Sequence, residues 1–216
     1  MMKYKAVVFD FDGTIVDSEE GIALAFQFAL RSKGIEEELN MIKELIGPPL
    51  SRTIITKYGL SEVDGAKAMV LHREYYNEIG MYQSKLFPLV IEMLEELKAM
   101  GVKMMIATNK AEEFAVKQVK YFKLEEYFTS IVGNNHTQTR GTKSDFIRIA
   151  TAELGLNKEE IMMVGDRYND IEAGKEVGLD TVGVLYGYGS KEEISNIAPT
   201  YIIKDPLELL AIVKGE

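Results

Sequence analysis

Two aspartates, Asp10 and Asp12, stand one residue apart directly after the apolar run Ala-Val-Val-Phe in the stretch KAVVFDFDGT. A third aspartate, Asp166, follows another apolar run further along the chain. Carboxylates that lie together raise one another's pKa, so a group of three is costly without a cation. Magnesium is usually bound through one or two carboxylates together with the phosphate oxygens of a substrate. These residue types therefore indicate metal-assisted chemistry on a phosphorylated compound.

Other polar residues also follow apolar runs. Thr108 and Asn109 come after the run 103–107, and Asp170 closes the stretch GDRYND, which follows a later run. In an open α/β sheet, ligands bind outside the carboxyl ends of the strands. We therefore expect these side chains to gather at one edge of the sheet. Lys143 lies just before a helical segment and could reach the same edge.

These groups suit phosphoryl transfer. Thr108 can donate hydrogen bonds to phosphate oxygens, and the ammonium of Lys143 can neutralise charge on a phosphoryl group. One carboxylate is then available to attack phosphorus and form an aspartyl-phosphate. A second carboxyl group, in a different environment, can protonate the leaving oxygen and later activate water. The set predicts a nucleophile and an acid/base group arranged around a metal ion.

The elements that must position these residues are short buried strands alternating with helices. The predicted strands are 6–9, 103–107, 161–164, 181–184 and 201–203, with 130–132 as a weaker candidate. Helical periodicity covers 89–97, 111–122, 144–154 and 171–177. Strands alternating with helices of this length predict βαβ units and a parallel sheet. We therefore expect an α/β fold with a Rossmann-like, doubly wound parallel sheet.

The segment from 17 to 84 interrupts this alternation. It carries helical patterns in series, at 18–33, 38–46, 50–58 and 62–79, and no convincing strand separates them. We therefore predict two domains. Residues 1–16 and 85–216 would form the α/β core, and residues 17–84 a small all-helical cap inserted after the first strand.

Four stretches resemble, in order and in spacing, the motifs of the haloacid dehalogenase-like superfamily: DFDGTIVDS, ATNK, the isolated Lys143 and GDRYND. The resemblance spans nearly the whole chain, and four ordered motifs are a strong signal. It implies that Asp10 is the nucleophile and Asp12 the general acid/base. It also implies that Thr108 and Lys143 hold the phosphoryl group, and we place Asn109 with them as a phosphate-binding residue.

The same resemblance implies magnesium as the cofactor. Asp166 would bind the ion together with Asp10 and the backbone carbonyl of Asp12, while Asp170 would support these ligands. The helical insertion resembles the superfamily's first cap type, which closes over the site. The stretches IGPPL and GVLYGYGS are similar to the branch that contains phosphoglycolate phosphatases and bacterial 5'-nucleotidase-like phosphatases.

Several residues have alternative interpretations. Thr108 and Asn109 could cap the following helix and do nothing more. Lys110 is interpreted as a supporting or surface residue, not as a catalyst. Arg167 stands where many members of the superfamily have Ser or Thr, and it could tune substrate choice or face the solvent. Arg52, in the third helical pattern of the insertion, is the candidate for binding the distal group of the substrate.

The implied activity is that of a magnesium-dependent phosphatase that hydrolyses a small, phosphoglycolate-like phosphomonoester through an aspartyl-phosphate. The alternative is a 5'-nucleotidase, and less favoured options are a β-phosphoglucomutase-type phosphomutase and a pyrophosphatase. Thr14 in the stretch DGT favours a phosphatase over a mutase. A non-enzymatic phosphoacceptor receiver domain would be about half this length and would have no helical insertion after its first acidic strand.

Composition narrows the partners. The net charge of -9 argues against a large basic surface for nucleic acid or anionic lipid. The absence of cysteine excludes disulfides and cysteine-ligated zinc. Neither a targeting segment nor a run of roughly 20 apolar residues is visible, so the expected location is the cytoplasm. The expected partner is a small phosphorylated metabolite, and both a monomer and a homodimer remain open.

Overall fold

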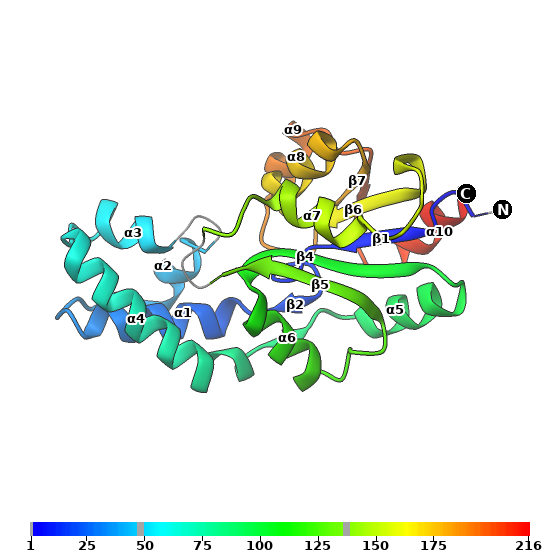
Figure 1. Cartoon of the computed structure of the whole chain (residues 1–216). Helices are drawn as coiled ribbons and strands as arrows, with labels where there is room; N and C mark the ends of the chain where they lie inside the picture. Colours follow the sequence, from blue (N-terminus) through cyan, green and yellow to red (C-terminus); the bar gives the residue numbers. More distant parts are fainter. Residues whose placement is uncertain (1, 47–49, 136–138) are drawn as a thin grey trace. The chain divides into compact units, whose positions relative to one another are not determined.

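A six-stranded sheet forms the centre of the larger of two compact units. The computed structural model describes residues 2–46, 50–135 and 139–216. The strands lie in the spatial order β5 (Phe128–Asn134), β4 (Lys103–Ala111), β1 (Ala6–Phe9), β6 (Ile161–Gly165), β7 (Asp180–Val184) and β8 (Tyr201–Ile203). Every pairing between these neighbours is parallel. The chain fills the side of β4 and β5 first and then crosses to β6, so β1 marks the switch point of a doubly wound sheet (Figure 1).

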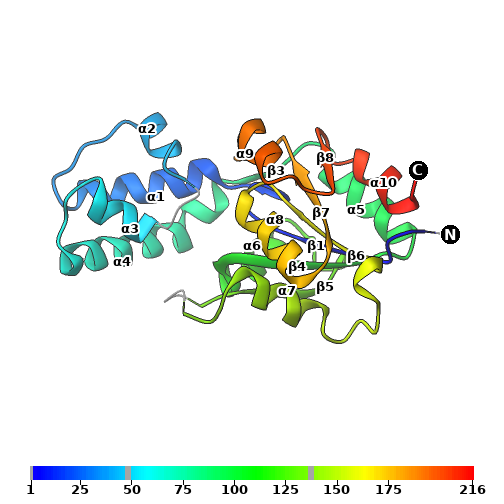
Figure 2. The same cartoon turned by 90° about the horizontal axis from the view of Figure 1, so that it is seen from above.

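Different helices cover the two faces of this sheet. Successive side chains of a strand point to opposite faces, and Val7 and Phe9 accordingly pack in one core cluster while Ala6 and Val8 pack in another. The first cluster includes residues of α5 (Val90–Ala99), α6 (Glu112–Tyr121) and α10 (Glu208–Lys214). The second includes residues of α7 (Lys143–Thr151) and α8 (Tyr168–Val177). Figures 1 and 2 show α5 and α6 on the opposite side of the sheet from α7 and α8. Because both faces are buried, the strands read as continuous apolar runs.

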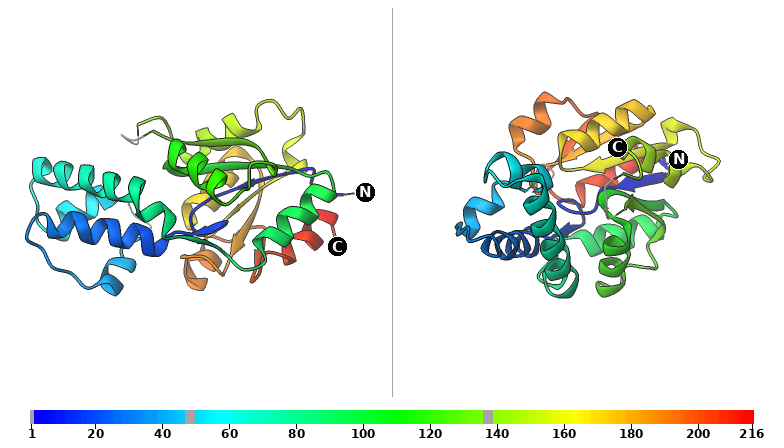
Figure 3. Two further views of the ribbon diagram at one scale, coloured as in Figure 1. Left: turned by 90° about the horizontal axis from the view of Figure 1, so that it is seen from below. Right: turned by 60° about the vertical axis from the view of Figure 1, so that its left-hand side comes forward.

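The second unit, Asp17–Lys85, is helical. Its elements are α1 (Glu19–Arg31), α2 (Leu39–Lys43), α3 (Leu50–Thr56), α4 (Glu62–Glu78) and a short 3-10 helix, η1 (Gly80–Tyr82). It has its own apolar core, in which Phe26, Leu30, Ile42 and Ile54 are fully buried. Within this unit α1 and α4 run alongside each other (Figure 3). The remainder of the chain, Met1–Val16 with Leu86–Glu216, makes up the first unit. The two-residue strands β2 (Val16–Asp17) and β3 (Lys85–Leu86) pair with each other.

The predicted α/β class with a doubly wound parallel sheet is confirmed. The largest change at the carboxyl end of a predicted strand is in β4, which does not end at residue 107 but continues to Ala111. Thr108 and Asn109 therefore lie inside the strand, and the prediction that they follow it was wrong. The cause is an irregularity in the ladder: Thr108 pairs with Gly133, the register then shifts, and Ala111 pairs with Asn134.

The structure also contains two α-helices that the periodicity did not predict: α9 (Lys191–Asn196), between β7 and β8, and α10 (Glu208–Lys214), after β8. One feature from the sequence falls outside the described residues: positions 47–49 of the stretch IGPPL. Among the helices that are described, none combines the length and the apolar character that crossing a membrane would require.

Candidate active site

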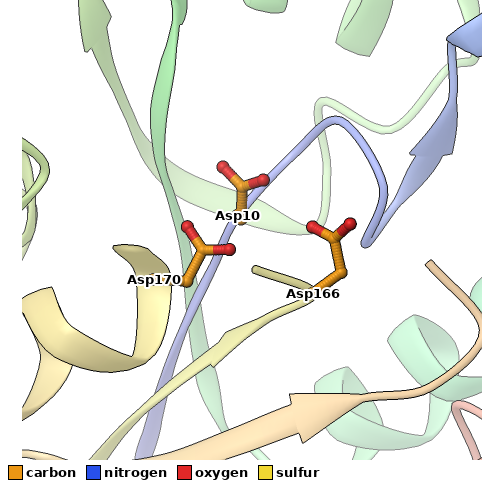
Figure 4. A group of neighbouring side chains, drawn as sticks. All are labelled: Asp10, Asp166 and Asp170. Atoms are coloured by element: carbon orange, nitrogen blue, oxygen red, sulfur yellow. The ribbon is translucent and has the colours of Figure 1, made fainter. Parts of the chain in front are cut away.

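Three buried carboxylates meet at the carboxyl ends of β1 and β6. Asp10 follows β1 directly, Asp166 follows β6 directly, and Asp170 lies in the first turn of α8. Each offers an oxygen atom, and these three oxygen atoms all lie within 4.8 Å of one another. Figure 4 shows the three side chains gathered at these strand ends. Only 7% of Asp10, 0% of Asp166 and 1% of Asp170 is exposed to solvent, so water screens the repulsion between their charges only weakly.

The sheet topology explains why Asp10 and Asp166 are neighbours although 155 residues separate them. The strands β1 and β6 pair in register from Ala6 with Ile161 to Phe9 with Val164. The amide N–H of Asp10 extends this ladder by donating to the carbonyl oxygen of Val164, at 2.8 Å. Asp10 is the next residue after Phe9, and Asp166 comes two residues after Val164, just past Gly165 at the end of β6. The pairing therefore brings the two side chains to the same edge, at the switch point where ligands bind in sheets of this type.

Lys143 is the cation of the cluster. Its ammonium forms an ion pair with Asp10 and a second with Oδ1 of Asp170, at 2.8 Å. Burial acts to lower the pKa of Lys143, but Asp10 and Asp170 outweigh it, so that its pKa is raised and the ammonium stays charged. Lys143 is the first residue of α7, and a capping box between Thr142 and Asp145 fixes that helix end. The sequence GTKSD therefore carries the local signal that positions the lysine.

The single ammonium of Lys143 does not balance the three carboxyl groups around it. Burial raises the pKa of Asp10 to about 7; Asp170 and Asp12 add to the shift, while Lys143 opposes it. Burial, followed by the charges of Asp170 and Asp10, also raises the pKa of Asp166 well above its usual range. If Asp10, Asp166 and Asp170 are all ionised, three negative charges face the single positive charge of Lys143. A divalent cation with oxygen ligands would balance this charge, so the residues present fit a magnesium ion.

Asp166 is held from the two loops that flank it. The hydroxyl of Thr14 donates to its Oδ1 at 3.4 Å, and the backbone N–H of Tyr188 donates to its Oδ2 at 2.8 Å. Gly13 lies against the same carboxylate with a φ of +90°, and a Cβ at that position would collide with the carboxylate oxygens. Glycine is therefore needed at position 13 for two reasons: its positive φ, and the lack of space for a Cβ beside the Asp166 carboxylate. Gly13 and Thr14 of the stretch DGT therefore help to position Asp166.

Asp170 is oriented by its own helix. One carboxylate oxygen, Oδ2, accepts a hydrogen bond from the N–H of Arg167 at 3.0 Å, and the other, Oδ1, faces Lys143. A carboxylate in the first turn of a helix is also favoured by the helix dipole. This contact explains the spacing of the two aspartates in GDRYND. Asp170 is the third residue of α8, from where its carboxylate can accept the N–H of the N-cap residue, Arg167.

Asp12 has a partner that the sequence did not reveal. The ammonium of Lys110 lies 2.8 Å from Oδ1 of Asp12, and the Lys110 side chain is only 6% exposed. The same ammonium lies 5.6 Å from the centre of the Phe11 ring. Of the two interpretations of Lys110, a supporting or a surface residue, the second is wrong, because its side chain is buried against Asp12. The available signal was its place in ATNK, at the end of a buried strand.

The other predicted residues are placed as follows. Thr108 is buried, and its hydroxyl accepts a hydrogen bond from the N–H of Lys110 at 3.2 Å. The N-cap of α6 is Ala111, so neither Thr108 nor Asn109 caps that helix. Asn109 is exposed within β4. Arg52 is exposed on α3, which belongs to the helical unit.

Comparisons with known proteins give a consistent family. A family model described as haloacid dehalogenase-like hydrolase matches residues 7–184. A 5'-nucleotidase of Pseudomonas aeruginosa is 33% identical, with 99% of this chain and 97% of that protein covered. A phosphoglycolate phosphatase of Vibrio parahaemolyticus is 32% identical, with 97% of this chain and 96% of that protein covered.

Two further relatives show the breadth of the group. A protein named tyrosine-protein kinase from Mycobacterium tuberculosis is 34% identical, over 91% of this chain and 67% of its own length. A solved structure described as a predicted phosphatase from Clostridium acetobutylicum superposes with a TM-score of 0.89 at 33% identity, covering 99% of each chain. Nearly the whole of this chain is thus shared with proteins that carry different functional names.

Proposed function

Because the chain belongs to the haloacid dehalogenase-like hydrolase family, we propose that it is a magnesium-dependent phosphatase that hydrolyses a small, phosphoglycolate-like phosphomonoester through an aspartyl-phosphate. The observation that carries this proposal is the buried set of Asp10, Asp166 and Asp170 around one ammonium, that of Lys143. An acidic cluster held at a sheet edge by a lysine combines a nucleophile, a cation site and a phosphoryl-binding charge.

In the proposed first step, a carboxylate oxygen of Asp10 attacks phosphorus. Lys143 holds Oδ1 of Asp10, so we assign Oδ2 as the attacking atom. A bond forms between this oxygen and phosphorus while the bond from phosphorus to the alcohol oxygen breaks. Asp12 gives its proton to that leaving oxygen, and the phosphoryl group remains on Asp10.

In the second step, water attacks the phosphoryl group. Asp12, now ionised, takes a proton from the water, the bond between Asp10 and phosphorus breaks, and inorganic phosphate leaves. Lys110 keeps the Asp12 carboxylate in a defined position, because its ammonium lies 2.8 Å from Oδ1. Thr108 donates to a phosphoryl oxygen, and Asn109 lies on the same strand as a second candidate for that group.

Magnesium would be held by Asp10, Asp166 and the backbone carbonyl of Asp12, with Asp170 supporting them. When bound, it neutralises charge on the phosphoryl group and orients it. Dialysed protein treated with EDTA should lose activity and regain it with added magnesium. Undiminished turnover in EDTA would contradict the assignment.

The substrate is the finer part of the proposal. The Vibrio relative is named phosphoglycolate phosphatase and the Pseudomonas relative 5'-nucleotidase, so these two substrate classes lead, ahead of mutase or pyrophosphatase activity. The helical unit, Asp17–Lys85, serves as the cap in this proposal, and Arg52 on its helix α3 binds the distal anion of the substrate. A cytoplasmic location stays a prediction from the sequence.

A phosphate-release screen over phosphoglycolate, nucleoside monophosphates, sugar phosphates and pyrophosphate tests the substrate class. We expect phosphoglycolate to give the highest kcat/KM. A preference for nucleoside monophosphates would establish the alternative, and interconversion of sugar phosphates without phosphate release would indicate a mutase.

Arg52→Ala tests the cap contact. It should weaken transition-state binding of phosphoglycolate by about 1.5–3 kcal/mol, the scale of a hydrogen bond to a charged group, while turnover of p-nitrophenyl phosphate, which lacks a distal anion, stays nearly unchanged. Arg31→Ala is the matched control, since Arg31 is in the same unit and pairs with Glu36 at 3.1 Å. Equal losses on the two substrates would mean that Arg52 supports the fold of the cap and does not bind the substrate.

A further inference from the structure

The glycine-containing loop after β7 lies against Asp166. The N–H of Tyr188 donates to Oδ2 of Asp166 at 2.8 Å. On either side of Tyr188 the backbone approaches closely: a Cβ on Gly187 would collide with the Cβ of Asp166, and one on Gly189 would collide with its carbonyl oxygen. Both glycines are therefore required by close contact with Asp166, and Gly187 also by contact with the backbone carbonyl of Gly13. The stretch YGYGS is a support for an acidic residue of the site.

An ion pair connects the residue after Asp166 to helix α9, which follows the glycine-containing loop. The side chain of Arg167, the residue after Asp166, donates through Nε to Oε1 of Glu193 at 2.8 Å. The same Oε1 accepts the N–H of Tyr168 at 2.9 Å. The side chains of Arg167 and Glu193 are only 22% and 24% exposed. Arg167 therefore binds a residue of α9 and does not simply face the solvent, whereas a role in substrate choice stays a prediction.

Glu193 is also tied to the start of its own helix. Its N–H donates to the hydroxyl of Ser190, the N-cap of α9, at 3.0 Å. Ser190 directly follows Gly189 in the loop. The contacts therefore close a ring, from Asp166 through Arg167 to Glu193, along the first turn of α9 to Ser190, and back through Tyr188 to Asp166.

We propose that Glu193, acting through Arg167 and the N–H of Tyr168, is a positioning residue that holds the 186–190 loop in place and so fixes the metal-binding carboxylate of Asp166. This inference rests on the magnesium site of the proposed function. An isolated pair of this exposure contributes little to global stability. Its effect is local, because a loop with two glycines has high backbone freedom, and the Tyr188 N–H must stay aimed at a single oxygen.

Two measurements on the full-length, dialysed protein test the proposal. The first is calorimetric titration with magnesium chloride alone. Groups that directly orient metal ligands typically change affinity by about 10–100-fold, and Glu193 acts at one further remove, so Glu193→Ala should weaken magnesium binding by roughly threefold to tenfold. The second is hydrogen exchange of a peptide that contains Tyr188, without magnesium. We expect faster exchange in Glu193→Ala because the loosened loop no longer holds the Tyr188 N–H against Oδ2 of Asp166.

Glu192→Ala is the matched control, since Glu192 is the exposed neighbour on α9; it should leave both readouts at the wild-type value. Glu193→Gln keeps an oxygen acceptor for the two N–H donors and should restore most of the loop's protection. If Glu193→Ala lowers the Tm of the whole protein, Arg167→Met removes the same ion pair and leaves the α9 residue in place.

The outcomes separate this inference from the proposed function. Wild-type exchange at Tyr188 and wild-type magnesium affinity in both Glu193→Ala and Arg167→Met would overturn the inference. Wild-type protein that binds no magnesium would overturn the proposed metal site, while the exchange measurement would still decide whether Glu193 holds the loop. A change in substrate preference in Arg167→Met with unaltered magnesium affinity and exchange would assign Arg167 to the substrate and would also overturn the inference.

Discussion

Ionisable side chains gather at both ends of the parallel sheet, and the two groups differ in how their charges are balanced. At the carboxyl ends of the strands lie Asp10, Asp166, Asp170 and Lys143, which we call the carboxyl-edge cluster. At the amino ends lie Lys3, Tyr4, Asp180 and Tyr201, the amino-edge cluster. Both clusters connect β1 to strands that are distant in sequence.

In the amino-edge cluster each charge has a hydrogen-bonding partner. The hydroxyl of Tyr4 donates to Oδ2 of Asp180, and Lys3 donates to the hydroxyl of Tyr201 at 2.8 Å. The hydrogen bond from Tyr4 lowers the pKa of Asp180, with further help from Thr200. One carboxylate and one ammonium lie together here, so no further ion is needed.

In the carboxyl-edge cluster the shift has the opposite sign, since burial raises the pKa of Asp10 and of Asp166. The difference teaches how to distinguish a structural cluster from a reactive one. The amino-edge cluster pairs one carboxylate with one ammonium and joins strands, whereas the carboxyl-edge cluster buries three carboxyl groups with one ammonium. Carboxyl groups whose pKa is raised in this way are typical of functional sites.

The largest expected effect is on turnover. Asp10→Asn keeps the shape of the side chain but removes the charge that attacks phosphorus, so kcat should fall by roughly a thousandfold or more. Asp180→Asn, the same change in the amino-edge cluster, should leave kcat essentially at the wild-type value. Phosphate release by the two purified variants measures this difference, and a fully active Asp10→Asn protein would exclude the mechanism.

The second effect is on stability as a function of pH, measured by denaturant unfolding of metal-free protein. Asp10 has a pKa of about 7 when folded and an ordinary value of 3.8. Between these values the folded state binds more protons than the unfolded state, so the free energy of unfolding should fall as pH rises. One pKa unit corresponds to about 1.4 kcal/mol, so the change should amount to a few kcal/mol.

Asp180 acts in the opposite direction, because its lowered pKa gives a contribution that is present above its ordinary pKa of 3.8 and is lost as pH falls. Asp10→Asn should therefore flatten the decline between about pH 5 and pH 7, and magnesium should reduce it. Metal-free wild-type protein that becomes more stable over this range would contradict the assigned charge excess.

A smaller effect should follow from Lys110→Met, which tests whether Lys110 and Asp12 act together with the carboxyl-edge cluster. Loss of the ammonium removes the ion pair that holds Asp12 in position. General acid catalysis contributes about 10²–10⁴-fold in total. Because the acid would be misplaced and not removed, we expect kcat to fall by roughly tenfold. The loss should be greater for alkyl phosphates than for aryl phosphates, whose leaving groups depart without a proton. Lys120→Met, on exposed α6 surface, is the control. A rise in KM alone, equal for the two substrate types, would mean that Lys110 binds the phosphoryl group instead.

The smallest effect is expected in the amino-edge cluster. Tyr4→Phe removes the hydrogen bond to Asp180 while the ring stays buried. Hydrogen bonds to charged groups contribute about 1.5–3 kcal/mol, and since the Asp180 side chain is 33% exposed, about 1 kcal/mol of stability is the expected loss. The kcat should not change. A catalytic defect in this variant would show that the two ends of the sheet are coupled.

Much of the fold and part of the candidate site could be predicted from short stretches of the sequence. Strand Ala6–Phe9 and strand Tyr201–Ile203 match their predicted bounds, since a strand buried on both faces must be an unbroken apolar run. The family resemblance carried by DFDGTIVDS, ATNK, Lys143 and GDRYND is confirmed by the family model. The roles of Asp10, Asp12, Thr108, Lys143 and Asp166 stay predictions that the variants above test.

What the sequence determined is local: apolar runs, helix caps such as Thr142 with Asp145, and the order in which acidic residues follow strands. Tertiary structure alone decided which polar groups meet. Lys110 reaches Asp12 across 98 residues of sequence, and Glu193 reaches Arg167 across 26. No spacing rule links such pairs, because their distance is set by the pairing of β1 with β4 and by the return of the chain after β7. The raised pKa of Asp10 has the same origin, since burial and neighbouring charges exist only once the strands are side by side.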